Sequence, residues 1–168
     1  MGIFQPTAVR ERVTDISPEF LNRLGIKALL LDVDNTLATY SSHTPSEGSL
    51  EWVRAMGDAG FRMIIISNNY KKRVKSFGVM FGLDTLSFAI KPLPVGYLRA
   101  ARRLKVKRSE CVIIGDQIFT DIVGANLCGM KSVLLTPMEP EEGFSFKVRR
   151  HFEKGLREKF RNRKDVLR

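Results

Sequence analysis

Short apolar runs alternate along the chain with longer segments whose apolar residues recur every three or four positions. The short runs predict buried strands, because a strand that is covered on both faces is apolar throughout. They cover residues 27–33, 61–66, 86–90, 111–115 and 132–135. The longer segments predict helices, which cover residues 45 to about 57, 71–81, 94–104 and 119–127. This alternation predicts right-handed βαβ units and hence an α/β fold, a three-layer sandwich with a mainly parallel five-stranded sheet.

The chain of 168 residues is long enough for one domain with a substantial core. We expect that domain to cover residues 25–138. Residues 1–24 are predicted to be a flank that packs on it, and residues 139–168 a basic tail that is helical. The apolar runs are too short to cross a bilayer, and no secretory signal pattern is evident. The expected location is therefore intracellular, in the cytoplasm or peripherally on the inner face of a membrane.

Two carboxylates, Asp32 and Asp34, close the first predicted strand. Residues i and i+2 of a strand point the same way. Two like charges on one side of a buried strand are costly to desolvate and repel each other. A divalent cation removes that objection, and Mg²⁺ prefers oxygen ligands while keeping waters and phosphate oxygens in its shell. The pair therefore predicts a metal and phosphate site.

The following strands bring further polar groups to the same edge of the predicted sheet. Ser67 and Asn68 follow the second strand, Lys91 follows the third, and Asp116 follows the fourth, with Asp121 five residues later. Ligands of open parallel sheets bind outside the carboxyl ends of the strands. Each group alone would be an ordinary turn or surface residue. Together they predict a site for phosphoryl chemistry.

From about residue 27 to residue 135, these motifs resemble those of the haloacid dehalogenase superfamily. They are Asp-x-Asp-x-Thr at 32–36, a strand-ending Ser, a Lys, and Gly-Asp-x₄-Asp at 115–121. The resemblance implies that Asp32 is a nucleophile that takes the phosphoryl group as an aspartyl-phosphate. Asp34 would protonate the leaving oxygen and then activate water. Thr36 would support the geometry of the loop and help to bind phosphate.

The same resemblance implies phosphate-binding groups on the second and third strands. Ser67 and the backbone N–H of Asn68 would hold phosphoryl oxygens, and Lys91 would offset charge on the nucleophile and the transferred group. The acid at Asp34 also indicates the reaction. Dehalogenases of the superfamily lack it, and P-type ATPases carry Thr there. A phosphatase is favoured, although a phosphomutase, which usually carries a cap domain, stays formally open.

The expected cofactor is Mg²⁺. The resemblance implies that Asp116 binds the ion together with the carboxylate of Asp32 and the backbone carbonyl of Asp34. Asp121 would act at the metal or just behind it.

The spacing of the motifs predicts an uncovered site. Asp34 and Ser67 lie 33 residues apart, and Ser67 and Lys91 lie 24 apart. One helix, one strand and their loops use up each gap, so neither holds a cap domain. The motif sequences further resemble the capless YqeG branch, which is related to mitochondrial phosphatidylglycerophosphate phosphatases. Phosphatidylglycerophosphate is accordingly the substrate that we expect, and a small sugar phosphate is disfavoured.

The net charge of +10 favours an anionic partner. Residues 146–168 contain ten Lys or Arg against three acids, and an apolar stripe recurs every four residues at Val148, Phe152, Leu156 and Phe160. Two interpretations stay open. The stripe docks on the domain and its charges face water, or the segment lies as a basic amphipathic helix on an anionic membrane or on nucleic acid.

Two other functions also fit the sequence. One is removal of phosphate from nucleotides or nucleic-acid ends, which base-stacking aromatic residues near the site would support. The other is a basic RNA- or ribosome-binding protein that keeps the fold. The acid at Asp34 disfavours that function, because a pure binding protein does not need a general acid.

Overall fold

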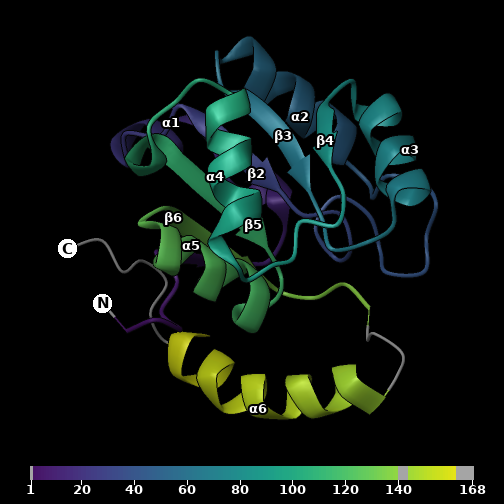
Figure 1. Ribbon diagram of the computed structural model, residues 1–168, viewed down its shortest axis with the longest axis vertical. Helices are drawn as coiled ribbons and strands as arrows, with labels where there is room; N and C mark the ends of the chain where they lie inside the picture. The colour runs from purple at the N-terminus through teal and green to yellow at the C-terminus, as the bar shows by residue number, and fades with distance from the viewer. Residues whose placement is uncertain (1, 140–143, 162–168) are drawn as a thin grey trace.

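The computed structural model describes residues 2–139 and 144–161, including the side chains of 151–160 in the second range. Its centre is a six-stranded parallel sheet in the order β1-β6-β5-β2-β3-β4 (Figure 1). The strands are β1 Ala8–Arg10, β2 Ala28–Leu31, β3 Arg62–Ile66, β4 Asp84–Leu86, β5 Cys111–Gly115 and β6 Lys131–Leu135. The predicted α/β fold is confirmed, with one further strand. That strand is β1, which pairs with β6 at the edge of the sheet.

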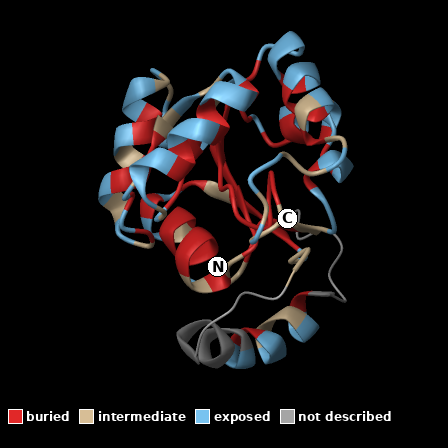
Figure 2. Cartoon of the chain, turned by 90° about the vertical axis from the view of Figure 1, so that its right-hand side faces the viewer, coloured by how far each residue is buried: buried red, intermediate tan, exposed pale blue. Residues whose placement is uncertain are grey.

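Helices cover both faces of the sheet. On one face lie α1 Pro18–Arg23, α2 Ser49–Asp58 and α3 Lys71–Phe81, and on the other lie α4 Pro94–Arg103 and α5 Val123–Cys128. Successive residues of β2 point to opposite faces, so Leu29 and Leu31 pack under the first layer and Leu30 under the second. Both faces are therefore covered, and Figure 2 shows the strands buried between the helices.

The third predicted strand, 86–90, is wrong in its position. β4 ends at Leu86, and Phe88 and Ile90 follow with left-handed φ angles of 48° and 55°. A strand cannot continue through such angles. After Leu86, only Ala89 of this run turns inward, whereas Phe88 and Ile90 are each 61% exposed. The apolar character of residues 88–90 therefore does not come from burial in a strand.

Two predicted helices begin differently. The helix expected from Pro45 begins at Ser49 in α2. The helix expected over 119–127 begins as a single π-helical turn, η3 Ile118–Ile122, and continues as α5. Short 3₁₀ turns, η1 Val13–Asp15 and η2 Arg108–Glu110, complete the regular structure.

The C-terminal helix, α6 Phe144–Arg161, lies beside η3, outside the layers of the sandwich (Figure 1). Leu156 and Phe160 pack with Ile118, Ile122 and Leu134, while Phe152 is 65% exposed. The side chain of Val148 and residues 162–168 lie outside the described residues. Part of the predicted stripe therefore docks on the domain. Among the described helices, none combines the length and the apolar character needed to cross a bilayer.

Candidate active site

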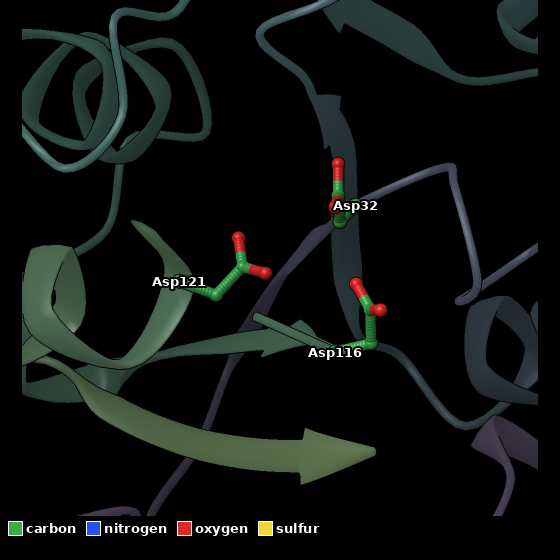
Figure 3. Close-up of side chains that lie close together, drawn as sticks. All are labelled: Asp32, Asp116 and Asp121. Carbon is green, nitrogen blue, oxygen red and sulfur yellow. The ribbon is translucent and has the colours of Figure 1, made fainter. Parts of the chain in front are cut away.

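The register of the central strands brings the predicted site residues to one edge. Leu31 of β2 lies level with Ile65 of β3 and with Ile114 of β5. The residues that follow these strands therefore meet at their carboxyl ends. Carboxylate oxygens of Asp32, Asp116 and Asp121 lie within 4.8 Å of one another, and all three residues are buried. Figure 3 shows Asp32 beyond β2, Asp116 beyond β5 and Asp121 reaching toward them from η3.

Lys91 ties this cluster together. Its Nζ lies 2.9 Å from Oδ1 of Asp32 and donates to Oδ1 of Asp121 at 2.7 Å. Asn68 holds the backbone of Lys91: its side-chain amide donates to the carbonyl of Lys91 at 2.9 Å, and its Oδ1 accepts from the N–H of Lys91 at 2.7 Å. Asn68 thus positions the lysine in addition to its predicted role toward phosphate.

The charges of the cluster fit a divalent cation. Three buried carboxylates face one ammonium group. Burial raises the pKa of Asp32 well above its ordinary value of 3.8; Lys91 opposes that shift, and the carboxylates of Asp121 and Asp116 add to it. Burial would lower the pKa of Lys91, but Asp121 and Asp32 outweigh burial and raise it. A bound cation would offset the remaining negative charge, and oxygen ligands suit Mg²⁺.

Asp121 has both carboxylate oxygens engaged within the chain. Oδ1 accepts from Lys91, and Oδ2 accepts from the backbone N–H of Gln117 at 3.1 Å. Gly115 makes room for this carboxylate, because a Cβ at that position would lie 2.2 Å from Oδ2 of Asp121. The Gly-Asp motif therefore places the aspartate of η3 against the end of β5. This geometry favours a place for Asp121 just behind a metal.

Asp34 lies apart from the acidic cluster and has its own partners. Arg73 donates to Oδ1 at 2.6 Å, and the side-chain amide of Asn69 donates to Oδ2 at 3.1 Å. Arg73 was not among the predicted site residues, and it is only 9% exposed. A signal was present, since Arg73 precedes Val74 and lies one helical turn before Phe77, and both of these are buried.

The first loop is held closed by its own backbone and by the segment after β6. The N–H of Thr36 donates to the carbonyl of Val33, and the side chain of Thr36 is buried. Asn35, at a left-handed φ of 57°, exchanges two hydrogen bonds with the backbone of Glu139, at 3.0 and 2.9 Å. Asparagine tolerates this conformation better than most residues. The turn between Asp32 and Thr36 is thus fixed from both sides.

A buried pair on α6 contacts the fourth motif, and sequence reasoning missed it. Glu153 is fully buried and accepts the N–H of Ile118 at 2.8 Å. Arg157 donates to the backbone carbonyl of Asp116 and forms an ion pair with Glu153. Their charges belonged to a run that is ordinarily exposed to solvent. The spacing of four residues on one helix was the available signal.

The mouth of the site is uncapped. Residues 35–66 form one loop, α2 and β3, and residues 67–91 form α3, β4 and their loops. Exposed apolar residues surround part of the opening. Tyr70 follows Asn69, whose carbonyl accepts the N–H of Phe88, and Ile90 directly precedes Lys91. We call the following residues, which are 51–61% exposed, the apolar rim: Tyr70, Phe88, Ile90 and Leu93.

Comparisons with known proteins agree with this geometry. A family model described as haloacid dehalogenase-like hydrolase matches residues 4–129. The chain is 32% identical to probable phosphatase YqeG of Bacillus subtilis, over 91% of this chain and 89% of that protein. It is 30% identical to phosphatidylglycerophosphate phosphatase 1 of Arabidopsis thaliana, over 82% of this chain but only 42% of that protein.

A solved structure has the same fold. It is an uncharacterized protein from Listeria monocytogenes serotype 4b, with a TM-score of 0.57 and 18% identity over 71% of this chain and 85% of that one. At this identity the likeness concerns the fold alone. The family model and the similarity to YqeG go further. The chain belongs to the haloacid dehalogenase-like hydrolase family, and it is a phosphatase of that family.

Proposed function

We propose that the protein is a Mg²⁺-dependent phosphatase that hydrolyses a phosphate monoester through an aspartyl-phosphate at Asp32. The observation that carries the proposal is the bridge of Lys91 between Asp32 and Asp121, at 2.9 and 2.7 Å, beside Asp116. This arrangement holds a carboxylate nucleophile next to a fixed positive charge. Asp34 has separate partners, which suits a residue with a different task.

The proposed reaction has two steps. An oxygen of Asp32 attacks phosphorus, the bond from phosphorus to the ester oxygen breaks, and Asp34 gives a proton to the leaving alcohol. In the second step Asp34 takes a proton from water, and the water oxygen attacks phosphorus. The bond between phosphorus and the oxygen of Asp32 breaks, so that inorganic phosphate leaves and Asp32 is regenerated. Ser67, which is buried at the end of β3, and the N–H of Asn68 would hold phosphoryl oxygens.

The metal has a fitting donor set. Asp32, Asp116 and the backbone carbonyl of Asp34 would hold Mg²⁺, with Asp121 behind them. When bound, the ion supplies positive charge that offsets the charge of the phosphoryl oxygens. Lys91 supplies a second, permanent positive charge from the protein, close to the nucleophile.

The substrate that we propose is phosphatidylglycerophosphate, a phosphate monoester borne by a lipid. An uncapped mouth accepts a phosphate presented from a surface, and the apolar rim lies at that mouth together with the exposed Lys71 and Lys72. Apolar side chains beside basic ones suit the boundary of an anionic membrane. The name of the Arabidopsis relative agrees with this substrate.

Peripheral contact with an anionic membrane could involve residues 146–168 as well, and we include it in the proposal. Lys154 and Lys159 of α6 are exposed, whereas Leu156 and Phe160 pack on the domain. The contribution of α6 would therefore come from these lysines and from Phe152, which is exposed. Nucleic acid is the alternative anionic partner, and nucleotides or phosphorylated oligonucleotides are the alternative substrates.

The decisive experiment compares phosphate release from the lipid in mixed micelles, from nucleotides and from 5′-phosphorylated oligonucleotides, with Mg²⁺ and with EDTA. We expect the lipid to be hydrolysed fastest, and only with Mg²⁺. Asp32→Asn should abolish turnover of every substrate, including an aryl phosphate. Asp58→Asn, on the exposed end of α2, is the matched control and should retain full activity. Turnover by Asp32→Asn would refute the mechanism, and faster hydrolysis of the oligonucleotide would refute the lipid substrate.

A further inference from the structure

The helix α6 reaches the loop that bears the proposed metal ligands. Its Glu153 is 0% exposed, and one carboxylate oxygen accepts the backbone N–H groups of Ile118 at 2.8 Å and Phe119 at 3.4 Å. These are the first two N–H groups of η3. The first N–H groups of a helix have no partner inside the helix, and they attract negative charge. Glu153 thus caps η3 from a helix that lies 35 residues away in the sequence.

Arg157 secures the same loop one helical turn further along α6. Its guanidinium donates to the backbone carbonyl of Asp116, and at 3.0 Å to that of Leu135 at the end of β6. It also lies 3.2 Å from Oε2 of Glu153. A planar guanidinium with five donors can make all of these contacts at once. Glu153 and Arg157 therefore hold both ends of the turn from Asp116 to Phe119 by hydrogen bonds to its backbone.

The hydrogen bonds from α6 to this turn affect the geometry of the acidic cluster. Asp116 begins this turn and Asp121 follows it. Carboxylate oxygens of both residues lie within 4.8 Å of one another and of an oxygen of Asp32. A π-helical turn such as η3 is a local departure from regular helix, and it needs support from its surroundings. That support comes from α6, together with the hydrogen bond from the N–H of Gln117 to Asp121.

We propose that Glu153 and Arg157 are positioning residues for the metal loop, and that the docking of α6 sets the affinity of the site for Mg²⁺. The inference rests on the metal site of the proposed function. Groups that orient metal ligands typically change metal affinity or activity by about 10- to 100-fold when they are removed. The basic C-terminal helix is then part of the catalytic unit, and a surface that bound α6 away from the domain would weaken the site.

The test measures metal binding directly, by the loss of the free Mn²⁺ signal in electron paramagnetic resonance, with Mg²⁺ as competitor. Glu153→Ala in the full chain should weaken binding by about 10-fold or more. Glu158→Ala is the matched control, because it removes the same charge from an exposed position on the same helix, and it should bind as the wild type does. With saturating Mg²⁺, the KM of Glu153→Ala for an aryl phosphate should be little changed.

Conservative variants separate positioning from general stability. Glu153→Gln keeps an acceptor oxygen, and Arg157→Lys keeps the charge, so both should bind Mn²⁺ with intermediate affinity. If Glu153→Ala fails to fold, these two variants and hydrogen exchange at the amides of Ile118 and Phe119 carry the test. We expect faster exchange at these amides in step with weaker binding.

Wild-type Mn²⁺ affinity in folded Glu153→Ala, or in both conservative variants, would overturn the inference. It would leave the proposed phosphatase activity untouched. Conversely, an inactive wild type that binds Mn²⁺ in a way that depends on Glu153 would support the inference and refute the proposed reaction.

Discussion

Asp32 lies in surroundings that are unfavourable for a charged carboxylate. It is 5% exposed and lies beside two further buried carboxylates, with Lys91 as its cationic partner. Burial raises its pKa well above 3.8. An acid whose pKa is higher in the folded chain than in the unfolded chain costs stability as the pH rises above its unfolded value. The metal-free protein therefore carries a free-energy cost at neutral pH that a cation would relieve.

Replacing Asp32 should make the metal-free protein more stable. In EDTA at pH 7 we expect Asp32→Asn to raise the Tm, because the cost of burying the charge of Asp32 disappears. The gain should shrink as the pH falls below the ordinary value of 3.8, where Asp32 binds a proton in both the folded and the unfolded state. Thermal unfolding followed by circular dichroism measures it.

Asp34→Asn is the contrasting variant for this measurement. It leaves the guanidinium of Arg73 without its carboxylate partner, so it should lower the Tm. A wild type that is more stable than Asp32→Asn at every pH in EDTA would contradict the assignment of a strained buried charge to Asp32.

Sequence reasoning found the residues whose spacing encodes the chemistry and missed those that hold them. Asp32, Ser67 and Asp116 directly follow apolar strands, and Lys91 lies five residues after β4. A parallel sheet brings such positions together. Arg73 and Glu153 lie within runs of charge on helices, where exposure is the ordinary outcome. Only the packing of each helix determines which of its charges turns inward, and that packing depends on contacts between residues distant in sequence.

The element that shapes the site most is the turn from β5 through η3 into α5. Gly115 ends β5 because the carboxylate of Asp121 occupies the space of a side chain there. The boundaries of such a turn were not readable from periodicity, since one π-helical turn shifts the register of apolar residues. The same limit applies to β4. Residues 88–90 are apolar, but Phe88 and Ile90 belong to the rim and Ala89 is buried outside any strand.

Gly115→Ala should disable the site while leaving the fold in place. The added Cβ would lie 2.2 Å from Oδ2 of Asp121, so the carboxylate must move away from Lys91. We expect kcat to fall by about 10-fold or more, since groups that position a site typically contribute that much. Phosphate release from an aryl phosphate at saturating Mg²⁺ measures the effect.

Gly57→Ala is the matched control for this prediction. Gly57 lies within α2, and a Cβ there would contact only Cε of Met63, at the ordinary distance of 3.6 Å. It should keep full activity and stabilise the protein by about 0.5–1 kcal/mol, because alanine favours helix over glycine. Equal activities of the two variants would show that Asp121 need not contact Lys91.

At the scale of the whole molecule, positive charge and exposed apolar groups meet at the mouth of the site. The net charge of +10 gives a general attraction to anionic surfaces. In the proposed function the apolar rim would be the place of contact, since Phe88 and Ile90 adopt left-handed φ angles with side chains that are 61% exposed. Bulky residues in that conformation are strained, and such strain is concentrated at functional sites. Contact through the rim would bring the open site against the surface that bears the substrate.

The protein should therefore bind vesicles of phosphatidylglycerol and phosphatidylcholine, and bind vesicles of phosphatidylcholine alone much more weakly. Phe88→Ser should weaken binding by about 10-fold or more, because a buried Phe side chain contributes about 1.5–3 kcal/mol. Val79→Ser, at the far end of α3 and 77% exposed, removes a comparable apolar group away from the mouth and should bind normally. Lys154→Gln with Lys159→Gln measures the contribution of α6 without deleting Glu153 and Arg157. Equal losses for Phe88→Ser and Val79→Ser would show that the rim is not the place of contact.

Cosedimentation at rising salt concentrations then separates the electrostatic from the apolar part of the attraction, since screening weakens the contribution of the lysines and leaves that of Phe88.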